Sequence, residues 1–589
     1  MSHIANRKTG IMVLASINTQ CKASQRQDNR KMVGTKAISW LLFILFAECY
    51  HTKEAHHKPV VTVSEGKLRG TVEKIYDGSS YYSFKGIPYA EAPVGAHRFQ
   101  SQPSPPRNWH GVRDASKHGP VCTQYDFTIS QYIEGSEQCL FVNVYTKSLK
   151  TDAKIPVMVF IHGGSYMSGS GNSDTFSPDL LLEHNVILVT INYRLELLGF
   201  LAVDSHDVPG SGGMKDTVEA LRWIKKNIAK FGGDPDNVTI FGESSGASSV
   251  TYLMMSPLAN GLFNKVIAQS GTCFEDWAQA RNMKERAFRA AKVLGKDAKN
   301  VEELLDFLRS VPPLNLTNLT EKTMTEEEKY RGFPEQFVPV VEEKLTGVEL
   351  FIDEDPVQKV VKGKVSKMPI MLGYNSGEGI STISDEIKKL DVKNNNVSLF
   401  VPRSIVEVVS KEKALEFGRR IQSFYGTITK DHPEVIRDIL TDANFAYNTH
   451  RFAYLYSKLN APVYMYRFNY ETDLNIIKKF SSYKDIPGVS HADDLFYLFY
   501  NNLNKDAYDN QPKLRDIAHE VTKLWTDFAK FGNPTPDGSL GVAWQPYTPS
   551  GKEYFNIQEK YSNGKYADKD RIEFWNQIYR EAGLPHIGQ

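Results

Sequence analysis

The stretch Val238–Val250 contains four serines, in a pattern that could activate one of them as a nucleophile. Only Ser244 has a glycine two residues before it and two residues after it, at Gly242 and Gly246, which matches the motif G-x-S-x-G. A nucleophile on a sharp turn from a strand into a helix needs small residues at both places, because larger side chains would collide. The free amides at the start of that helix also favour a developing anion. The spacing therefore predicts that Ser244 is the nucleophile.

A glycine-rich stretch could supply backbone amides for that anion. The segment Val159–Gly171, VFIHGGSYMSGSG, follows a buried apolar run and places Ser165 after two consecutive glycines. Glycine lets the backbone approach a substrate oxygen with its N–H groups forward, and a serine keeps the amide while adding a hydroxymethyl group. We therefore expect part of an oxyanion hole here; the alternative is a plain glycine-rich turn.

A serine hydroxyl needs a base at neutral pH, and the base needs a carboxylate that fixes its tautomer. His491 lies in a loop sequence just before a predicted apolar helix, which suits a base carried by a loop. Glu378 follows the strand-like PIMLGYN and lies between two glycines, and the chain order Ser, acid, His is that of α/β-hydrolases. Asp493 and Asp494 are alternative acids, although they lie close to His491 in the sequence and on the predicted helix.

The elements around these residues are typical of a parallel sheet. The apolar runs at 155–164 and 186–194 are rich in Val and Ile, which suits strands buried on both faces. Residues 216–233 place apolar side chains at helical spacing and end at a glycine pair. The alternation of strand and helix predicts an α/β fold with a central, mostly parallel, twisted sheet flanked by helices. The charged region from about 271 to 364 predicts helical insertions over the active site.

Composition excludes some classes of function. The 589 residues include 70 Lys plus Arg against 69 Asp plus Glu, a formal net charge of +1, so no nucleic-acid partner is expected. We see no cluster of metal ligands in the sequence, so we expect no metal and no organic cofactor. The oligomeric state, monomer or homodimer, stays open.

The N-terminal sequence predicts export. The apolar run AISWLLFILFA at 37–47 is shorter than the about 20 residues that span a bilayer, and lysines precede it. We expect a signal peptide at 32–50 that begins at an initiating methionine, with 1–31 an N-terminal extension; the alternative is a signal-anchor. The catalytic domain is expected at 58–585, in a secreted protein without a stable membrane anchor. Four sequons could then carry glycans: Asn237, Asn315, Asn318 and Asn396. Asn237 is the least suited, because it begins a predicted strand.

Together these motifs resemble those of a type-B carboxylesterase, a cholinesterase-like member of the α/β-hydrolase fold family, of the insect secreted kind. The likeness runs from about Val60 to Trp575 and rests on FKGIPYAEAPVGAHRF, GSEQCLFVNVY, NYRLELLGF, FGGDPDNVTIFGESSGA, GYNSGEG and GVSHADDLFYLF. It implies a serine hydrolase that acts on small to medium carboxylic esters (xenobiotic, lipid-like or semiochemical) through an acyl-enzyme intermediate.

The resemblance also implies roles for single residues. Ser244, Glu378 and His491 would form the catalytic triad. The backbone amides of three further residues would form the oxyanion hole: Gly164, Ser165 and Ser245. The other implied features are a Cys122–Cys139 disulfide, ion pairs of Arg98 with Glu137 and of Arg194 with Asp216, and a substrate pocket that includes Trp277 and Glu243.

Three positions depart from the family pattern: Gln138 stands where Asp is usual, Ser245 where Ala is usual, and Glu196 where Gly is usual. The loop from Cys122 to Cys139 also lacks the Trp that binds a quaternary ammonium in cholinesterases, which argues against choline esters. Members that hydrolyse juvenile hormone usually carry Gln where this chain has Glu243, which argues weakly against that role.

The loop HGGSYMSGSGN resembles that of neuroligin-like adhesion proteins as closely as that of active esterases. Those proteins keep the fold and bind partners without a nucleophile. A catalytically weak binding protein is therefore the alternative function. The presence of the serine, the acid and the histidine at matching places favours the hydrolase.

Overall fold

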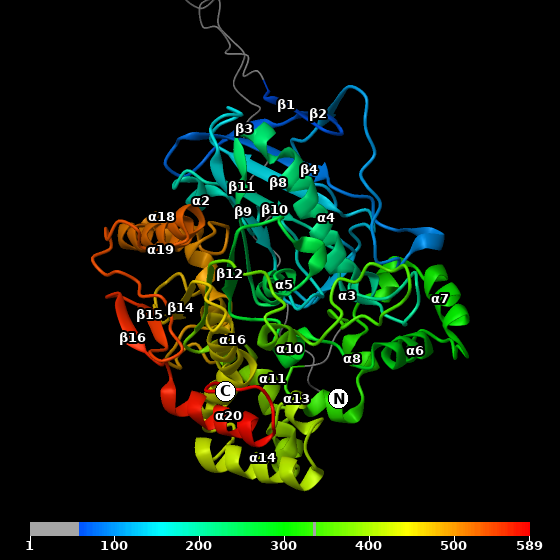
Figure 1. Cartoon of the computed structure of the whole chain (residues 1–589), viewed down its shortest axis with the longest axis vertical. Coiled ribbons are helices and arrows are strands. Elements are labelled where there is room, and N and C mark those ends of the chain that lie inside the picture. The colour runs from blue at the N-terminus through cyan, green and yellow to red at the C-terminus, as the bar shows by residue number, and fades with distance from the viewer. Residues whose placement is uncertain (1–57, 334–336) are drawn as a thin grey trace, which may run out of the picture. The chain divides into compact units, whose positions relative to one another are not determined.

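The computed structural model describes residues 58–333 and 337–589 (Figure 1). The predicted extension at 1–31 and signal peptide at 32–50 lie outside this part. Within it, the largest sheet has eleven strands in the order β16-β15-β14-β13-β12-β11-β9-β10-β8-β4-β3. Their bounds are β3 (Thr71–Lys74), β4 (Ser80–Pro88), β8 (Phe141–Thr146), β9 (Ile155–Ile161), β10 (Ile187–Ile191), β11 (Gly233–Glu243), β12 (Lys265–Gln269), β13 (Ile370–Asn375), β14 (Val463–Phe468), β15 (Glu553–Ile557) and β16 (Ser562–Lys565).

The centre of this sheet is parallel and its ends are antiparallel. Every neighbouring pair from β10 through β15 is parallel, whereas β16, β8, β4 and β3 join in antiparallel fashion. This arrangement confirms the predicted α/β-hydrolase fold. A smaller sheet consists of β1 (Val60–Val63), β2 (Gly66–Arg69) and β5 (Val112–Asp114), and β1 and β2 form an antiparallel hairpin.

Helices cover both faces of the large sheet, and strand β9 shows why. Val157, Val159 and Ile161 belong to one apolar core, while Met158 and Phe160 alternate with them and belong to the other. Because successive side chains of a strand point to opposite faces, a strand buried on both sides has to be apolar throughout. The first core includes side chains from α4 (Gly212–Asn227), α5 (Ser245–Leu253) and α16 (Tyr447–Ser457). The second includes side chains from α2 (Asp179–Leu182) and α19 (Pro512–Phe531), which Figure 1 shows across the sheet from α4.

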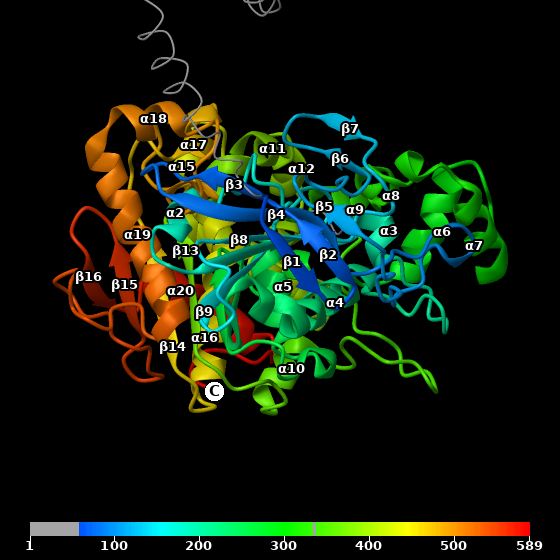
Figure 2. The ribbon, with the colours of Figure 1, turned by 90° about the horizontal axis from the view of Figure 1, so that it is seen from above.

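Two helical regions interrupt the alternation of strands and helices. Between β12 and β13 lie α6 (Met283–Val293), α7 (Val301–Ser310), α8 (Thr320–Thr323), α9 (Glu326–Tyr330) and α10 (Pro356–Val361), as the sequence predicts. Between β13 and β14 lie α11 (Ile383–Ile387), α12 (Leu390–Asn395), α13 (Arg403–Val406), α14 (Lys411–Tyr425), α15 (Pro433–Thr441) and α16, a region for which the sequence analysis makes no prediction. Figure 2 shows α6 and α7 at the opposite end from α18 (Lys505–Asn510) and α19.

One local prediction is wrong. The apolar segment after His491 forms only a short 3₁₀ helix, Asp493–Tyr497, which begins after Ala492 in a left-handed conformation. The remaining helices of the C-terminal part are α17 (Ile476–Phe480) and α20 (Lys569–Glu581). Among the described helices, none combines the length and the apolar character needed to cross a bilayer.

Candidate active site

Ser244 stands at the sharp turn between β11 and α5. Its φ of 58° and ψ of −123° are unfavourable for a residue with a side chain, so the surrounding structure must impose them. A Cβ on Gly246 would come within 2.1 Å of the Ile161 carbonyl oxygen, and a Cβ on Gly242 would come within 2.6 Å of that same oxygen. Both glycines of the motif are therefore required by packing against β9. The last two serines of the stretch, Ser248 and Ser249, are buried in α5.

His491 faces the turn from a loop between α17 and the 3₁₀ helix. Its Nε2 lies 2.9 Å from Ser244 Oγ, and its Nδ1 lies 2.6 Å from an oxygen of Glu378. The imidazole ring thus bridges a hydroxyl and a carboxylate. In the tautomer that carries the imidazole proton on Nδ1, Nδ1 donates to Glu378. Nε2 then accepts a hydrogen bond from the Ser244 hydroxyl.

Glu378 begins a 3₁₀ helix just after β13 and is fully buried. Its second oxygen accepts a 2.6 Å hydrogen bond from the Asn375 amide, which fixes the carboxylate. The Gly377 amide donates to the Val489 carbonyl, which ties the acid loop to the histidine loop. The structure therefore brings together Ser244, His491 and Glu378 from three loops that are far apart in the sequence.

The alternative acids have other partners. Asp493 accepts hydrogen bonds from the backbone amides of Ile477 and Ser490, at 2.7 and 3.0 Å. It thereby connects the histidine loop to the Ile477 segment. Asp494 accepts from the Gln269 amide group at 2.7 Å and from the Asn375 amide group at 3.2 Å. Of the three candidate acids Glu378, Asp493 and Asp494, Glu378 is thus the one that contacts His491 directly.

The glycine-rich turn lies next to Ser244 with its backbone in left-handed conformations. Gly164, Ser165 and Tyr166 have φ values of 100°, 58° and 59°. A Cβ on Gly164 would come within 2.2 Å of the Ser168 carbonyl oxygen, so glycine is required there. Ser245, whose amide is the third expected donor, is the first residue of α5 and is fully buried.

Glu243 is buried beside the histidine and does not line the cavity of about 990 Å³ that reaches Trp277. One of its carboxylate oxygens lies 3.1 Å from His491 Nε2, the same nitrogen that faces Ser244. Burial raises the pKa of Glu243, and the nearby Asp494 and Glu378 raise it further. Burial lowers the pKa of His491, but the charges of Glu243 and Glu378 outweigh that effect and raise it. A charged Glu243 therefore favours the imidazolium form of His491, whereas a base must be neutral.

The Glu243→Gln substitution tests this coupling. It removes the negative charge that stabilises the His491 imidazolium, so the pKa of His491 should fall by about one unit or more. We expect the acidic limb of the kcat/KM profile for a neutral ester to move to lower pH by the same amount. The high-pH plateau, where His491 is neutral in both proteins, serves as the internal control. An acidic limb that stays in place or moves upward would contradict the coupling.

An aromatic wall stands on the other side of the histidine. The Phe445 ring lies 4.7 Å from the His491 ring, 6.0 Å from the Trp277 ring and 5.9 Å from the Phe333 ring, measured between centroids. Trp277 Nε1 donates a 2.9 Å hydrogen bond to the Asn444 carbonyl. A cavity of about 990 Å³ opens beyond this wall, lined among the described residues by Trp277, Phe333 and Asn444 but by neither Ser244 nor His491. Two rings of this wall thus line the cavity, and no side chain of the triad does.

Phe445 and Asn444 lie in a turn of π-helix, Asp442–Ala446, at the junction of α15 and α16. Such turns are rare and often occur at functional sites. Neither residue is predicted from the sequence. No sequence signal marks a π-turn, and the aromatic residue meets its partners only through contacts that are distant in the sequence.

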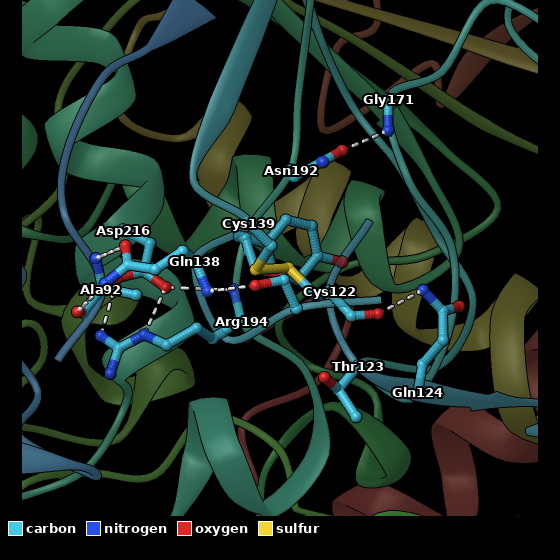
Figure 3. The surroundings of a disulfide bond; sticks show 12 residues. Ala92, Cys122, Thr123, Gln124, Gln138, Cys139, Gly171, Asn192, Arg194 and Asp216 are labelled. Carbon is cyan, nitrogen blue, oxygen red and sulfur yellow. Dashed lines mark hydrogen bonds and ion pairs between the residues drawn. A yellow bond between two sulfur atoms is a disulfide. The ribbon is translucent and has the colours of Figure 1, made fainter. Parts of the chain in front are cut away.

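The predicted disulfide between Cys122 and Cys139 is present, with an S–S distance of 2.01 Å (Figure 3). It closes a loop that carries the hairpin of β6 (Gln124–Asp126) and β7 (Gln131–Ile133). Gln138, one of the departures from the family pattern, forms two hydrogen bonds with the main chain of Ala92, at 3.2 and 3.1 Å. An aspartate could not donate one of these bonds, so the Gln side chain has a definite structural role.

The two ion pairs implied by the sequence are also present. Arg98 and Glu137 form a bidentate pair at 2.7 Å. Arg194 and Asp216 form a second pair, buried and also bidentate, at 2.8 and 2.7 Å (Figure 3). Both fix loops next to the disulfide. Among the described residues, no group of three or more His, Cys, Asp or Glu side chains has the arrangement of a metal site.

Several known proteins similar to this chain are esterases. The model of the carboxylesterase family matches residues 57–575. Esterase FE4 of Myzus persicae is 34% identical over 546 residues, covering 89% of this chain and 93% of that protein. The juvenile hormone esterase of Tribolium castaneum is 33% identical and covers 90% of this chain and 95% of that protein. The crystal structure of juvenile hormone esterase from Manduca sexta, with OTFP covalently attached, superimposes with a TM-score of 0.78 at 29% identity, covering 88% and 99% of the two chains.

Proposed function

Because this chain belongs to the carboxylesterase family, we propose that Ser244, His491 and Glu378 are the nucleophile, the base and the acid of its ester hydrolysis. The chain is a serine carboxylic-ester hydrolase by its family and its relatives. The single observation that carries the residue assignment is the His491 ring, which lies 2.9 Å from Ser244 Oγ on one side and 2.6 Å from Glu378 on the other.

The proposed reaction proceeds in two acyl transfers. His491 Nε2 takes the Ser244 proton as Oγ attacks the ester carbonyl carbon. The amides of Gly164, Ser165 and Ser245 stabilise the negative oxygen, each by about 2.7–4 kcal/mol as in measured oxyanion holes. The bond to the alcohol then breaks, and the alcohol leaves with the proton from His491. Water hydrolyses the acyl-enzyme by the same route and returns the proton to Ser244.

The acyl group is proposed to lie against Trp277 and Phe445. The Phe445 ring lies against His491 and Trp277 lies beside Phe445, and this bulk beside the triad should favour short acyl chains. This narrows the expected preference for small to medium esters to those with a short acyl group.

The test is phosphorylation by an organophosphate followed by peptide mapping. We expect one phosphoryl group per chain, on Ser244, and loss of ester turnover in proportion to labelling. Turnover of p-nitrophenyl esters should fall as the acyl chain lengthens from acetyl to octanoyl. A folded chain that is neither labelled nor active would contradict the assignment and favour the binding-protein alternative. Label on another residue would reassign the nucleophile.

We also propose that the catalytic domain spans 58–585 and is secreted. The Cys122–Cys139 disulfide supports this, because structural disulfides form mainly in oxidising compartments. Asn315 and Asn396 are exposed and suited to glycosylation. The Asn318 amide group donates to the Tyr132 hydroxyl, and Asn237 forms hydrogen bonds with Lys265 and Lys530, so these two sequons are less suited. Mass spectrometry of protein secreted from insect cells, which should lack residues 1–50, tests the proposal.

A further inference from the structure

The oxyanion turn of this chain lacks the conformational freedom that glycine would provide. Ser165 and Tyr166 both have side chains and both hold φ near 60°. L-residues other than glycine rarely adopt this region, and they stay there only when surrounding contacts impose it. Something in the structure must therefore hold these two residues.

Hydrogen bonds to the Tyr166 main chain come from both of its sides. Its N–H donates to the Ser245 hydroxyl oxygen at 3.3 Å, and its carbonyl accepts from the Glu196 N–H at 2.7 Å. The first bond fixes the peptide plane that joins Ser165 to Tyr166, and the second fixes the next plane. The φ and ψ of Tyr166 relate these two planes, and the first plane also fixes one side of the bond about which the Ser165 ψ turns.

Glu196 is itself held at a left-handed φ of 45°. Its buried carboxylate accepts hydrogen bonds from the amides of Asn318, Leu319 and Thr320 at 2.7, 3.0 and 3.3 Å, and from the Thr320 hydroxyl at 3.1 Å. Four donors on one buried carboxylate make a strong, charge-assisted anchor. The anchor connects the helical insertion before α8 to the backbone that holds Tyr166.

Two of the departures from the family pattern, Ser245 and Glu196, thus meet Ser165 at one place. Ser165 introduces the strain, and Ser245 and Glu196 supply the contacts that oppose it. We infer that the Ser245 hydroxyl and the Glu196 carboxylate are positioning groups that together hold the oxyanion turn of this chain in its left-handed form. The inference rests on the proposed function, because it assigns a purpose to the Ser165 and Ser245 amides.

The Ser245→Ala substitution removes the hydroxyl and keeps the backbone amide. We expect kcat for a short-chain ester to fall about tenfold, less than the loss of a whole oxyanion donor, with KM changed less than about twofold. The affinity for a trifluoromethyl ketone, which forms a tetrahedral adduct with the nucleophile, should fall by the same factor because it depends on the same amides. The matched control is Ser248→Ala in the same helix. Ser248 is also buried, and among the described residues no hydrogen bond joins its hydroxyl to the main chain of the oxyanion turn.

A double-mutant cycle separates this role from ordinary packing. In a Ser165→Gly background one of the two left-handed φ values is no longer strained, so adding Ser245→Ala should cost less than in the wild type, under about threefold. The Glu196→Gln substitution replaces one accepting oxygen by an NH₂ group, which cannot accept from the backbone N–H groups that face it. It should also lower kcat with a small effect on KM. Melting temperatures show whether each variant folds. Glu196→Gly, which suits the backbone conformation, replaces Glu196→Gln if the latter does not fold.

Three results would overturn the inference: a kcat for Ser245→Ala no lower than that of Ser248→Ala, equal costs of Ser245→Ala in both backgrounds, or a ketone affinity that does not change with kcat. Labelling by an organophosphate distinguishes this failure from that of the proposed function. A Ser245→Ala chain labelled on Ser244 at the wild-type rate overturns the positioning role alone. A wild-type chain not labelled on Ser244 overturns the nucleophile and the positioning role together.

Discussion

The Ser244→Ala variant should lose about 10⁶-fold in kcat for a chromogenic short-chain ester, as hydrolases lose when the nucleophile of a triad is removed. Without Oγ no acyl-enzyme forms, and His491 has no hydroxyl to deprotonate. The turn keeps its geometry, since alanine retains the Cβ that already occupies the strained position. Steady-state turnover, the burst of released alcohol and the organophosphate adduct should all disappear together.

The control for this variant is again Ser248→Ala, which removes a buried hydroxyl one helical turn further along. It should keep activity within about threefold, the usual small effect of a change outside the reacting groups. Both variants should melt close to the wild type. If Ser244→Ala retained more than about one part in a hundred of wild-type turnover, the loss would be far too small for a missing nucleophile, and another group would have to be acylated.

The elements that position the triad could be predicted because their causes are local. The requirement for small residues at Gly242 and Gly246 follows from the turn itself, and the structure shows both packed against the same carbonyl oxygen of β9. Likewise, an unbroken apolar run such as that of β9 indicates a strand buried on both faces, whichever strands flank it.

Other parts of the site depend on contacts between distant segments. Phe445 contacts His491 and Trp277 from a π-turn in a helical region for which the pattern gave no prediction. The Ser245 hydroxyl looked incidental in the sequence, because its partner, the Tyr166 amide, belongs to a loop 79 residues away. Glu196 stood out only as an exception to the family pattern, and its role depends on amides 122 to 124 residues further on. Such pairings are set by the packing of the whole domain.

The Glu378→Gln variant should lower kcat by about 10⁴-fold, as the loss of the acid does in a serine protease triad. Gln retains the oxygen that accepts from the Asn375 amide, so the side chain should stay in place. Its NH₂ group would then face His491 Nδ1 and donate to it, which moves the imidazole proton to Nε2. That tautomer cannot accept the Ser244 proton, and no carboxylate remains to stabilise the imidazolium.

The matched control is Asp494→Asn, because Asp494 is also buried and follows His491 closely in the sequence. Its carboxylate contacts Gln269 and Asn375 and no triad side chain, so we expect kcat to fall less than about tenfold once the folded fraction is accounted for. Melting temperature and kcat, measured on the same samples, separate stability from catalysis. A larger loss in Asp494→Asn than in Glu378→Gln would identify Asp494 as the acid. It would also mean that the 2.6 Å contact between Glu378 and His491 serves only to hold the loop.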